Sequence, residues 1–227
     1  APSAARADRR YYGETYNALI AEPGGIDVEL WSTLHQAPRS GGTQFWRHQL
    51  ELETGITHWW DVALYNVWKY EQGGTTRYEA TKLETRFRLA PPGTWPVDTV
   101  LYLEARKEWI DDKPLALEGK IIGSRDFGRL NLSANLSLEQ ELIPDGGTET
   151  EWGYAAGVSY ELHPVVRVGG EAWGTWTRSA GTTVSAQYAG PAVSLAYSRF
   201  WLVLAAGFGL NDDAEKLRFR AILALQL

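Results

Sequence analysis

The sequence predicts an all-β protein: a transmembrane antiparallel up-and-down β-barrel of about 12 strands with a short N-terminal extension. The first observation behind this prediction is alternation. From Arg129 to Leu142, leucines occupy alternate positions, and Asn, Ser and Glu stand between most of them. Because a strand turns successive side chains to opposite faces, this segment has one hydrocarbon face and one wet face along its whole length. A helical period of about 3.6 would scatter the leucines around a cylinder.

The second observation is the number and length of such segments. Most are longer than the roughly five or six residues usual in soluble sheets, and connectors rich in Gly, Pro and Asp separate them. We expect about twelve strands, at Ile26–His35, Gln44–Thr54, Asp61–Glu71, Thr76–Leu89, Asp98–Trp109, Leu115–Ser124, Arg129–Leu142, Glu151–Leu162, Val165–Thr177, Thr183–Ala196, Trp201–Leu210 and Lys216–Leu227.

The third observation is the charge on the polar faces of these strands. In a closed soluble core each such charge would cost several kcal/mol unless paired, whereas a wet lumen with lipid outside removes most of that cost. A soluble barrel or sandwich with the leucines turned inward is the alternative, and strand length and number favour the membrane barrel. We predict a network of lumen and selectivity residues at Glu51, Glu53, Lys82, Glu84, Arg86, Arg88, Glu104, Arg106, Glu108, Glu118, Lys120, Arg167, Glu171, Arg218 and Arg220.

The connectors indicate two different rims. Those after odd-numbered strands are polar and rich in Gly or Asp, while those after even-numbered strands carry Trp, Phe and Pro. Trp and Tyr number 11 each against 6 Phe, and these amphipathic rings settle at membrane–water interfaces. We therefore expect one aromatic rim and one acidic, flexible rim. The predicted membrane-interface aromatics are Trp59, Trp60, Trp95, Phe127, Phe200 and Trp201.

Composition limits the function classes. The sequence contains no run of eighteen apolar residues, the length that a transmembrane helix needs. A formal net charge of -6 argues against a nucleic-acid partner. Cysteine is absent, which excludes disulfides, a thiol nucleophile and Cys-type metal sites. Four scattered histidines argue against a zinc site. We expect no metal and no cofactor.

The chain opens at Ala1 without an initiator Met, which fits export and removal of a signal peptide, so we expect a location in the bacterial outer membrane. Residues 1–23 are assigned to an N-terminal extension and residues 24–227 to the barrel. The extension is either a lumen plug, with Arg6, Arg9 and Arg10 meeting the lumen glutamates, or a periplasmic tail.

Several blocks resemble a known group of proteins. They are Ala21–Trp31, Gln49–His58, Trp60–Tyr65, Tyr188–Pro191, Phe200–Leu202, Ala206–Asn211 and Leu217–Leu227. These blocks, about half of the chain, are similar to small bacterial outer-membrane β-barrel proteins of the MetA-pathway phenol-degradation and transporter-like families. The resemblance implies about twelve strands, an outer-membrane location and a transport role. The chain departs from it at Leu227, where such barrels commonly end in Phe.

We therefore predict a narrow channel or transporter for small solutes, which the family resemblance extends to apolar ones. Pro191 beside Gly190 predicts a bulge, since proline removes a ladder hydrogen bond. Such a kink can form a lateral opening towards lipid, but bulges are also ordinary features of barrels, and the sequence does not decide between the two. The first alternative is a non-conducting structural or partner subunit of an envelope complex. The expected partners are the lipid bilayer and, under this alternative, an envelope protein. The sequence names neither the solute, nor that protein, nor the oligomeric state.

An outer-membrane lipid hydrolase is the second alternative. His48 shares the parity of the lipid-facing leucines, and Ser32 on the preceding strand could pair with it near the outer rim. No third catalytic member and no GxSxG turn is evident, so we predict no catalytic residue. His35 is expected to be solvated, and His58 and His163 lie in turns.

Overall fold

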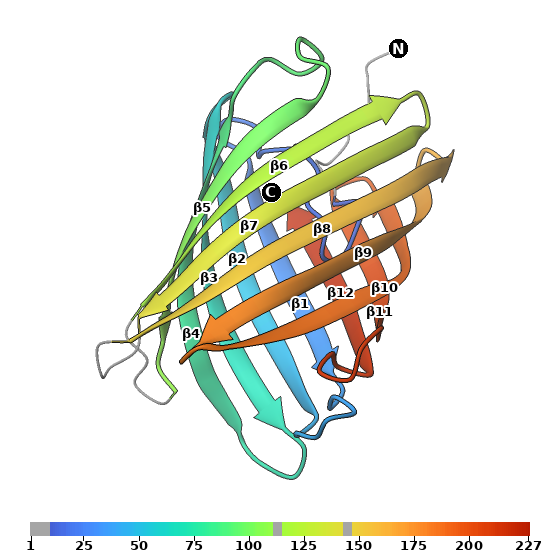
Figure 1. The fold of residues 1–227 in the computed structure, drawn as a ribbon. Coiled ribbons are helices and arrows are strands. Elements are labelled where there is room, and N and C mark those ends of the chain that lie inside the picture. Colours follow the sequence, from blue (N-terminus) through green and yellow to red (C-terminus); the bar gives the residue numbers. More distant parts are fainter. Residues whose placement is uncertain (1–9, 111–114, 143–146) are drawn as a thin grey trace.

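Twelve antiparallel strands close into a barrel in the computed structural model of the protein, which describes residues 10–110, 115–142 and 147–227 (Figure 1). Each strand pairs with its neighbours in sequence, and the last pairs with the first, so the predicted fold class is confirmed. The strands are β1 Ile26–His35, β2 Phe45–Thr57, β3 Trp60–Glu71, β4 Thr76–Arg88, β5 Asp98–Glu108, β6 Ala116–Phe127, β7 Leu130–Leu142, β8 Thr148–His163, β9 Val166–Ser179, β10 Thr182–Tyr197, β11 Phe200–Gly209 and β12 Leu217–Gln226.

The strand positions match the expected ones, but several ends run further into the turns. β8 begins three residues before its predicted start at Glu151, and β2 continues to Thr57. A ladder continues for as long as each strand finds a partner, and here the hairpins stay paired almost to the turn. No helix in the described part of the chain is long and apolar enough to cross a membrane.

The register aligns the faces around the wall. Leu30 of β1 lies opposite Leu50 of β2 on one side and Leu223 of β12 on the other, so the leucines form a continuous outer row. Leu30 is 51% exposed, whereas Glu51, on the other parity, is 0% exposed. Hydrocarbon therefore faces outward and charge faces inward, because the two-residue period keeps each face along a strand. The register shifts only near the rims, in the β2–β3, β3–β4 and β8–β9 pairs.

The wall is regular at Pro191, contrary to the predicted bulge. Ala189 pairs with Phe208 and Ala192 with Ala205, so the register between β10 and β11 is the same on both sides of the proline. Rungs are missing only at Gly190 and Pro191, because proline has no N–H to donate. A Cβ added at Gly190 would collide with the backbone of β11, so the two strands approach closely here and leave no lateral opening at this point.

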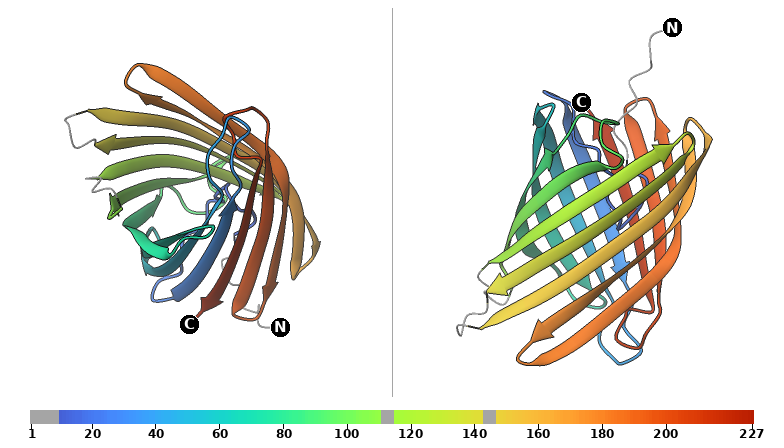
Figure 2. Two further views of the ribbon diagram at one scale, coloured as in Figure 1. Left: turned by 90° about the horizontal axis from the view of Figure 1, so that it is seen from below. Right: turned by 45° about the horizontal axis from the view of Figure 1, so that its top comes forward.

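Residues 10–22 lie inside the barrel. Figure 2 shows this segment, the darkest blue part of the trace, within the ring of strands. It passes Val100, Tyr102 and Ile122, which bury Ala18 and Ile20 in a small apolar cluster. The segment also bonds to other strands of the inner wall: Tyr12 donates to Asn131 of β7, and the carbonyl of Arg10 accepts a hydrogen bond from Ser194 of β10. The lumen is therefore lined by strands and occupied by this segment.

Candidate functional site

The outer face carries exposed aromatic side chains at the rim where the even-numbered strands end. Trp59, Trp60, Trp95, Phe127 and Phe200 lie there, all exposed. Trp201 does not belong with them, because it points inward and is 2% exposed, packed against Trp31 and Val203. The reason is alternation: once Phe200 takes the outer face of β11, its neighbour must take the inner one.

A second aromatic belt lies at the opposite rim, which we expected to be acidic and flexible. Tyr78, Trp109, Trp152 and Trp176 are exposed there on the outer face. Along β8, Trp152 and Tyr160 stand eight residues apart. At about 3.3 Å per residue and a tilt near 40°, that separation corresponds to roughly 20 Å along the barrel axis, close to the ~25 Å apolar band of outer-membrane barrels. Trp109, Trp152 and Trp176 share the outward parity of their strands, which was the signal in the sequence. Tyr78 does not, because the register shift between β3 and β4 turns it to the outer face.

Acidic side chains dominate the buried polar interior. Among the described residues, nine buried carboxylates face three buried arginines. The carboxylates are those of Asp27, Glu29, Glu51, Glu53, Asp61, Glu79, Glu84, Glu104 and Glu171, and the arginines are Arg10, Arg86 and Arg167. Half-buried cations on the same inward parity, namely Lys82, Arg88, Arg106, Lys120, Arg218 and Arg220, offset part of this excess. The acidic excess therefore lies in the buried layer of the interior, where it attracts cations and repels anions.

The predicted lumen residues all lie on the inward parity of their strands, at different depths. Glu51, Glu53, Glu84, Arg86, Glu104, Arg167 and Glu171 are buried, and Lys82, Arg88, Arg106, Glu108, Glu118, Lys120, Arg218 and Arg220 are half-buried. Many are joined by cross-strand ion pairs, such as Lys82 with Glu104 at 3.3 Å and Arg106 with Glu139 at 2.5 Å. Arg88 lies at the rim, where it donates to the carbonyl of His58 at 2.9 Å. Their role in selectivity remains a prediction.

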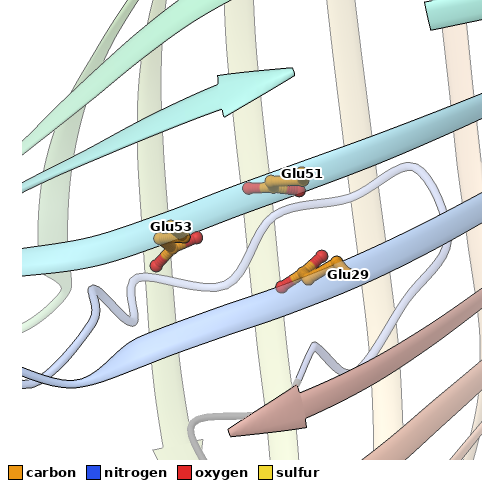
Figure 3. A group of neighbouring side chains, drawn as sticks. All are labelled: Glu29, Glu51 and Glu53. Carbon is orange, nitrogen blue, oxygen red and sulfur yellow. The ribbon is translucent and has the colours of Figure 1, made fainter. Parts of the chain in front are cut away.

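Three carboxylates meet on the inner wall of β1 and β2 (Figure 3). Oxygens of Glu29, Glu51 and Glu53 all lie within 4.8 Å of one another. The hairpin register puts Glu29 directly opposite Glu51, and Glu53 follows two residues later on the same face. The predicted lumen residues include Glu51 and Glu53 but not Glu29, although Glu29 has the inward parity of its strand; the hairpin register brings it to the pair. We call these three residues the carboxylate cluster.

Two neighbours orient the carboxylate cluster. The indole Nε1 of Trp31 donates to Glu29 at 2.9 Å and to Glu51 at 3.0 Å. The guanidinium of Arg86 bonds to Glu53 and, at 2.5 Å, to Asp61. Such oxygens could hold a hard cation, but one oxygen of each carboxylate is already engaged with a donor. The cluster is thus rigid and only partly neutralised.

Arg10 of the N-terminal segment reaches the same place. Its Nε lies 3.8 Å from Glu29, and its guanidinium stands over the rings of Tyr16 and Trp31, at 4.0 and 4.5 Å from their centroids. Arg10 is buried, and its Nη2 has no hydrogen-bond partner among the described residues. A cation from the chain itself therefore occupies the mouth of the carboxylate cluster.

Polar contacts hold the N-terminal segment in place. The carboxylate of Glu171 accepts hydrogen bonds from three consecutive backbone N–H groups, those of Gly13, Glu14 and Thr15, at 2.8 to 2.9 Å. Arg220 donates to the carboxylate of Glu14 at 2.9 Å. Glu171 and Arg220, predicted as lumen residues, thus bind this segment. Nothing in the sequence marks a carboxylate that caps a loop more than 150 residues away.

Asn135 holds the segment from another strand. Its side-chain oxygen accepts the backbone N–H of Tyr16 at 2.7 Å, and its side-chain nitrogen donates to the carbonyl of Tyr16 at 2.9 Å. The Asn135 amide thus pairs with the backbone N–H and C=O of one residue, as a neighbouring strand would. These hydrogen bonds fix the position of Tyr16 along the barrel axis, in addition to the apolar cluster around Ala18 and Ile20.

The loop between β11 and β12 closes against the inner wall near the other rim. Glu215 bonds to His35 at 2.7 Å and to Arg218 at 2.8 Å. His35, expected to be solvated, is instead 5% exposed, because this loop covers it. Burial of Glu215 opposes its ionisation, but the bonds to His35 and Arg218 outweigh it and lower the pKa of Glu215 to about 2.

The outer face holds the expected pair of Ser32 and His48. The serine Oγ lies 3.0 Å from Nδ1 of His48, and Trp46 stacks on the imidazole ring. Within the described part of the chain, no hydrogen bond from a carboxylate or amide side chain orients that histidine. The pair alone lacks the group that would hold the imidazole for general-base work.

Comparison with known proteins supports the architecture. No protein-family model and no curated protein matches the sequence. Among solved structures, the NanC porin superposes with a TM-score of 0.63 and 9% identity, covering 89% of this chain and 100% of that one. The KdgM porin superposes with a TM-score of 0.58 and 8% identity, covering 88% and 98%. At such identities the likeness shows a shared fold, that of small outer-membrane barrels.

Proposed function

We propose that this protein is a narrow outer-membrane channel for small cationic solutes, and that residues 10–22 close it in the conformation described. The observation that carries the proposal is a closed barrel with hydrocarbon outside and a surplus of buried carboxylates inside. The sidedness and the two aromatic belts suit insertion in a bilayer, which for such a barrel means the bacterial outer membrane. The similar structures are porins by name, which supports the channel.

The preference for cations follows from the charge on the inner wall. A narrow bore of twelve strands forces a passing ion close to these carboxylates, and low-dielectric walls strengthen their field. Charged rings of this kind choose ions by sign. The finer resemblance, to the phenol-degradation family, implies apolar solutes instead, and nothing in the charged interior favours these.

Residues 10–22 also bear on the alternative of a non-conducting envelope subunit, because a permanently inserted segment would leave no path for a solute through the barrel. Polar anchoring favours a removable segment, since its bonds to Glu171, Asn135 and Arg220 can be replaced by bonds to water. We propose no enzymatic activity, because the Ser32–His48 pair has no orienting group among the described residues.

Conductance in planar lipid bilayers tests the proposal. The intact chain is compared with a chain lacking residues 1–22 and, as a matched control, with a chain lacking residues 1–9, which keeps every described contact of the segment. We expect a larger current only after the longer truncation, and a reversal potential of cationic sign in a KCl gradient. If the chain lacking residues 1–22 folds but carries no current, the protein is a non-conducting structural subunit. A reversal potential of anionic sign would contradict the proposed preference for cations.

A further inference from the structure

We infer that the carboxylate cluster with Trp31 is a binding site for the guanidinium or ammonium group of a small organic cation, and that Arg10 occupies it as an intramolecular stand-in. The inference rests on the proposed channel and names the chemical class of its solute. Arg10 is then a competitor built into the chain, which the solute must displace.

The surroundings of Arg10 are those of a bound organic cation. Carboxylates lie on one side of its guanidinium, with Glu29 at 3.8 Å, and the faces of Trp31 and Tyr16 lie at 4.5 and 4.0 Å. Charge-assisted contacts and aromatic faces are the two means by which proteins recognise guanidinium and ammonium groups. Trp31 and Glu29 belong to the barrel wall, so half of this environment remains when the segment leaves.

Arg10 does not saturate the site. Oε1 of Glu51, a residue 0% exposed, has no hydrogen-bond partner among the described residues, and neither has Oδ1 of buried Asp27. A cavity of about 20 Å³, with room for about one water molecule, is lined by Asp27 together with Arg10, Glu29 and Arg86, among others. Buried acceptors without partners cost free energy, which a ligand with more N–H groups could recover.

The donor set suits an organic cation better than a metal ion. Calcium takes about six to eight oxygens, yet Trp31 already donates to Glu29 and Glu51, and Arg86 already bonds to Glu53. A guanidinium needs only one or two carboxylate oxygens and an aromatic face. Tyr65, whose ring meets that of Trp31 edge to face at 6.4 Å, extends the aromatic wall.

Competition with Arg10 gives the test. Agmatine, which carries a guanidinium and an ammonium group, is titrated into the detergent-solubilised full chain by calorimetry. We expect Arg10→Gln to tighten agmatine binding at least tenfold, because the competing cation is gone. The matched control is Arg178→Gln, which removes an exposed arginine on the outer face and should leave the affinity unchanged.

Variants of the wall complete the test. In the Arg10→Gln background, Glu51→Gln and Trp31→Leu, each tested separately, should weaken agmatine binding tenfold or more. The heat-induced shift in gel mobility shows whether each variant has folded, and each variant serves as a check on the other. Unchanged affinity in Arg10→Gln, or in both folded wall variants, overturns the inference. The inference is also overturned, in favour of a metal site, if calcium binds the Arg10→Gln chain as tightly as agmatine does and this calcium binding disappears when Glu51→Gln is added.

The outcomes also separate this inference from the proposed function. Agmatine binding without any conductance from the truncated chain would leave the site intact and remove the channel. Conductance that agmatine neither competes with nor slows, together with no binding, would keep the channel and remove the site.

Discussion

Replacing Glu171 by Gln is expected to release the N-terminal segment from the lumen. The Glu171 carboxylate accepts three backbone N–H bonds from Gly13, Glu14 and Thr15, at 2.8 to 2.9 Å. Hydrogen bonds to a charged group contribute about 1.5 to 3 kcal/mol each. Glutamine keeps one carbonyl oxygen and turns an NH₂ group towards donors, so the variant should lose on the order of 3 kcal/mol of anchoring after partial compensation by water.

A loss of about 3 kcal/mol raises the ratio of released to inserted segment roughly a hundredfold, because each 1.4 kcal/mol is a factor of about ten. Single-channel recordings measure this ratio as open probability, and limited trypsin cleavage after Arg10 measures it independently. The control is Glu151→Gln, whose carboxylate accepts a bond from Thr177 away from the segment. Equal open probability and equal cleavage in Glu171→Gln, Glu151→Gln and the intact chain would refute the assigned role of the carboxylate.

Three further changes have defined outcomes. The pKa of Glu215 is lowered to about 2 from its ordinary value near 4.5, which corresponds to at most about 3 kcal/mol of folding stability. This stability is complete above pH 4.5 and is lost as the pH falls through 2. Glu215→Gln should therefore lower the melting temperature in detergent at pH 7, and the difference from the intact chain should shrink below about pH 4. Leu136, 67% exposed at the middle of β7, faces the bilayer centre, so Leu136→Arg should cost about 2 to 4 kcal/mol in urea unfolding from lipid, against a much smaller cost for Leu136→Ala. His48→Ala should leave phospholipid hydrolysis at the background rate of the intact chain; a measurable hydrolysis that this change abolishes would establish the enzyme.

Local patterns in the sequence predicted much of the wall. Leu130 to Leu142 had to be a strand with one greasy face, because alternation is a property of neighbouring residues and needs no knowledge of the partner strand. The inward parity of Glu51, Glu84 and Arg86 followed in the same way. The predicted interface position of Trp201 was wrong because it was assigned from the residue's closeness to a turn and not from its parity in the strand.

Contacts between distant segments were beyond such reasoning. Glu171 and Gly13 are 158 residues apart, and only closure of the barrel around the segment brings them together. His35 was expected in water, but the loop that carries Glu215 folds over it from the other end of the chain. The predicted bulge at Pro191 did not occur, because the strands on both sides keep their register across the missing donor.

The sequence by itself determined the approximate strand count and the sidedness of the wall, since both follow from the order of apolar, polar and charged residues along the chain. Only the tertiary structure decided that Glu29 joins Glu51 and Glu53, that Arg10 lies over Trp31, and that residues 10–22 occupy the bore. These arrangements depend on hairpin register and on how the closed wall encloses the segment, and both are settled by contacts between residues far apart in the chain. The separation of leucine from glutamate can be read along the chain, whereas only the closed barrel decides between plug and tail and sets Arg10 beside Glu29.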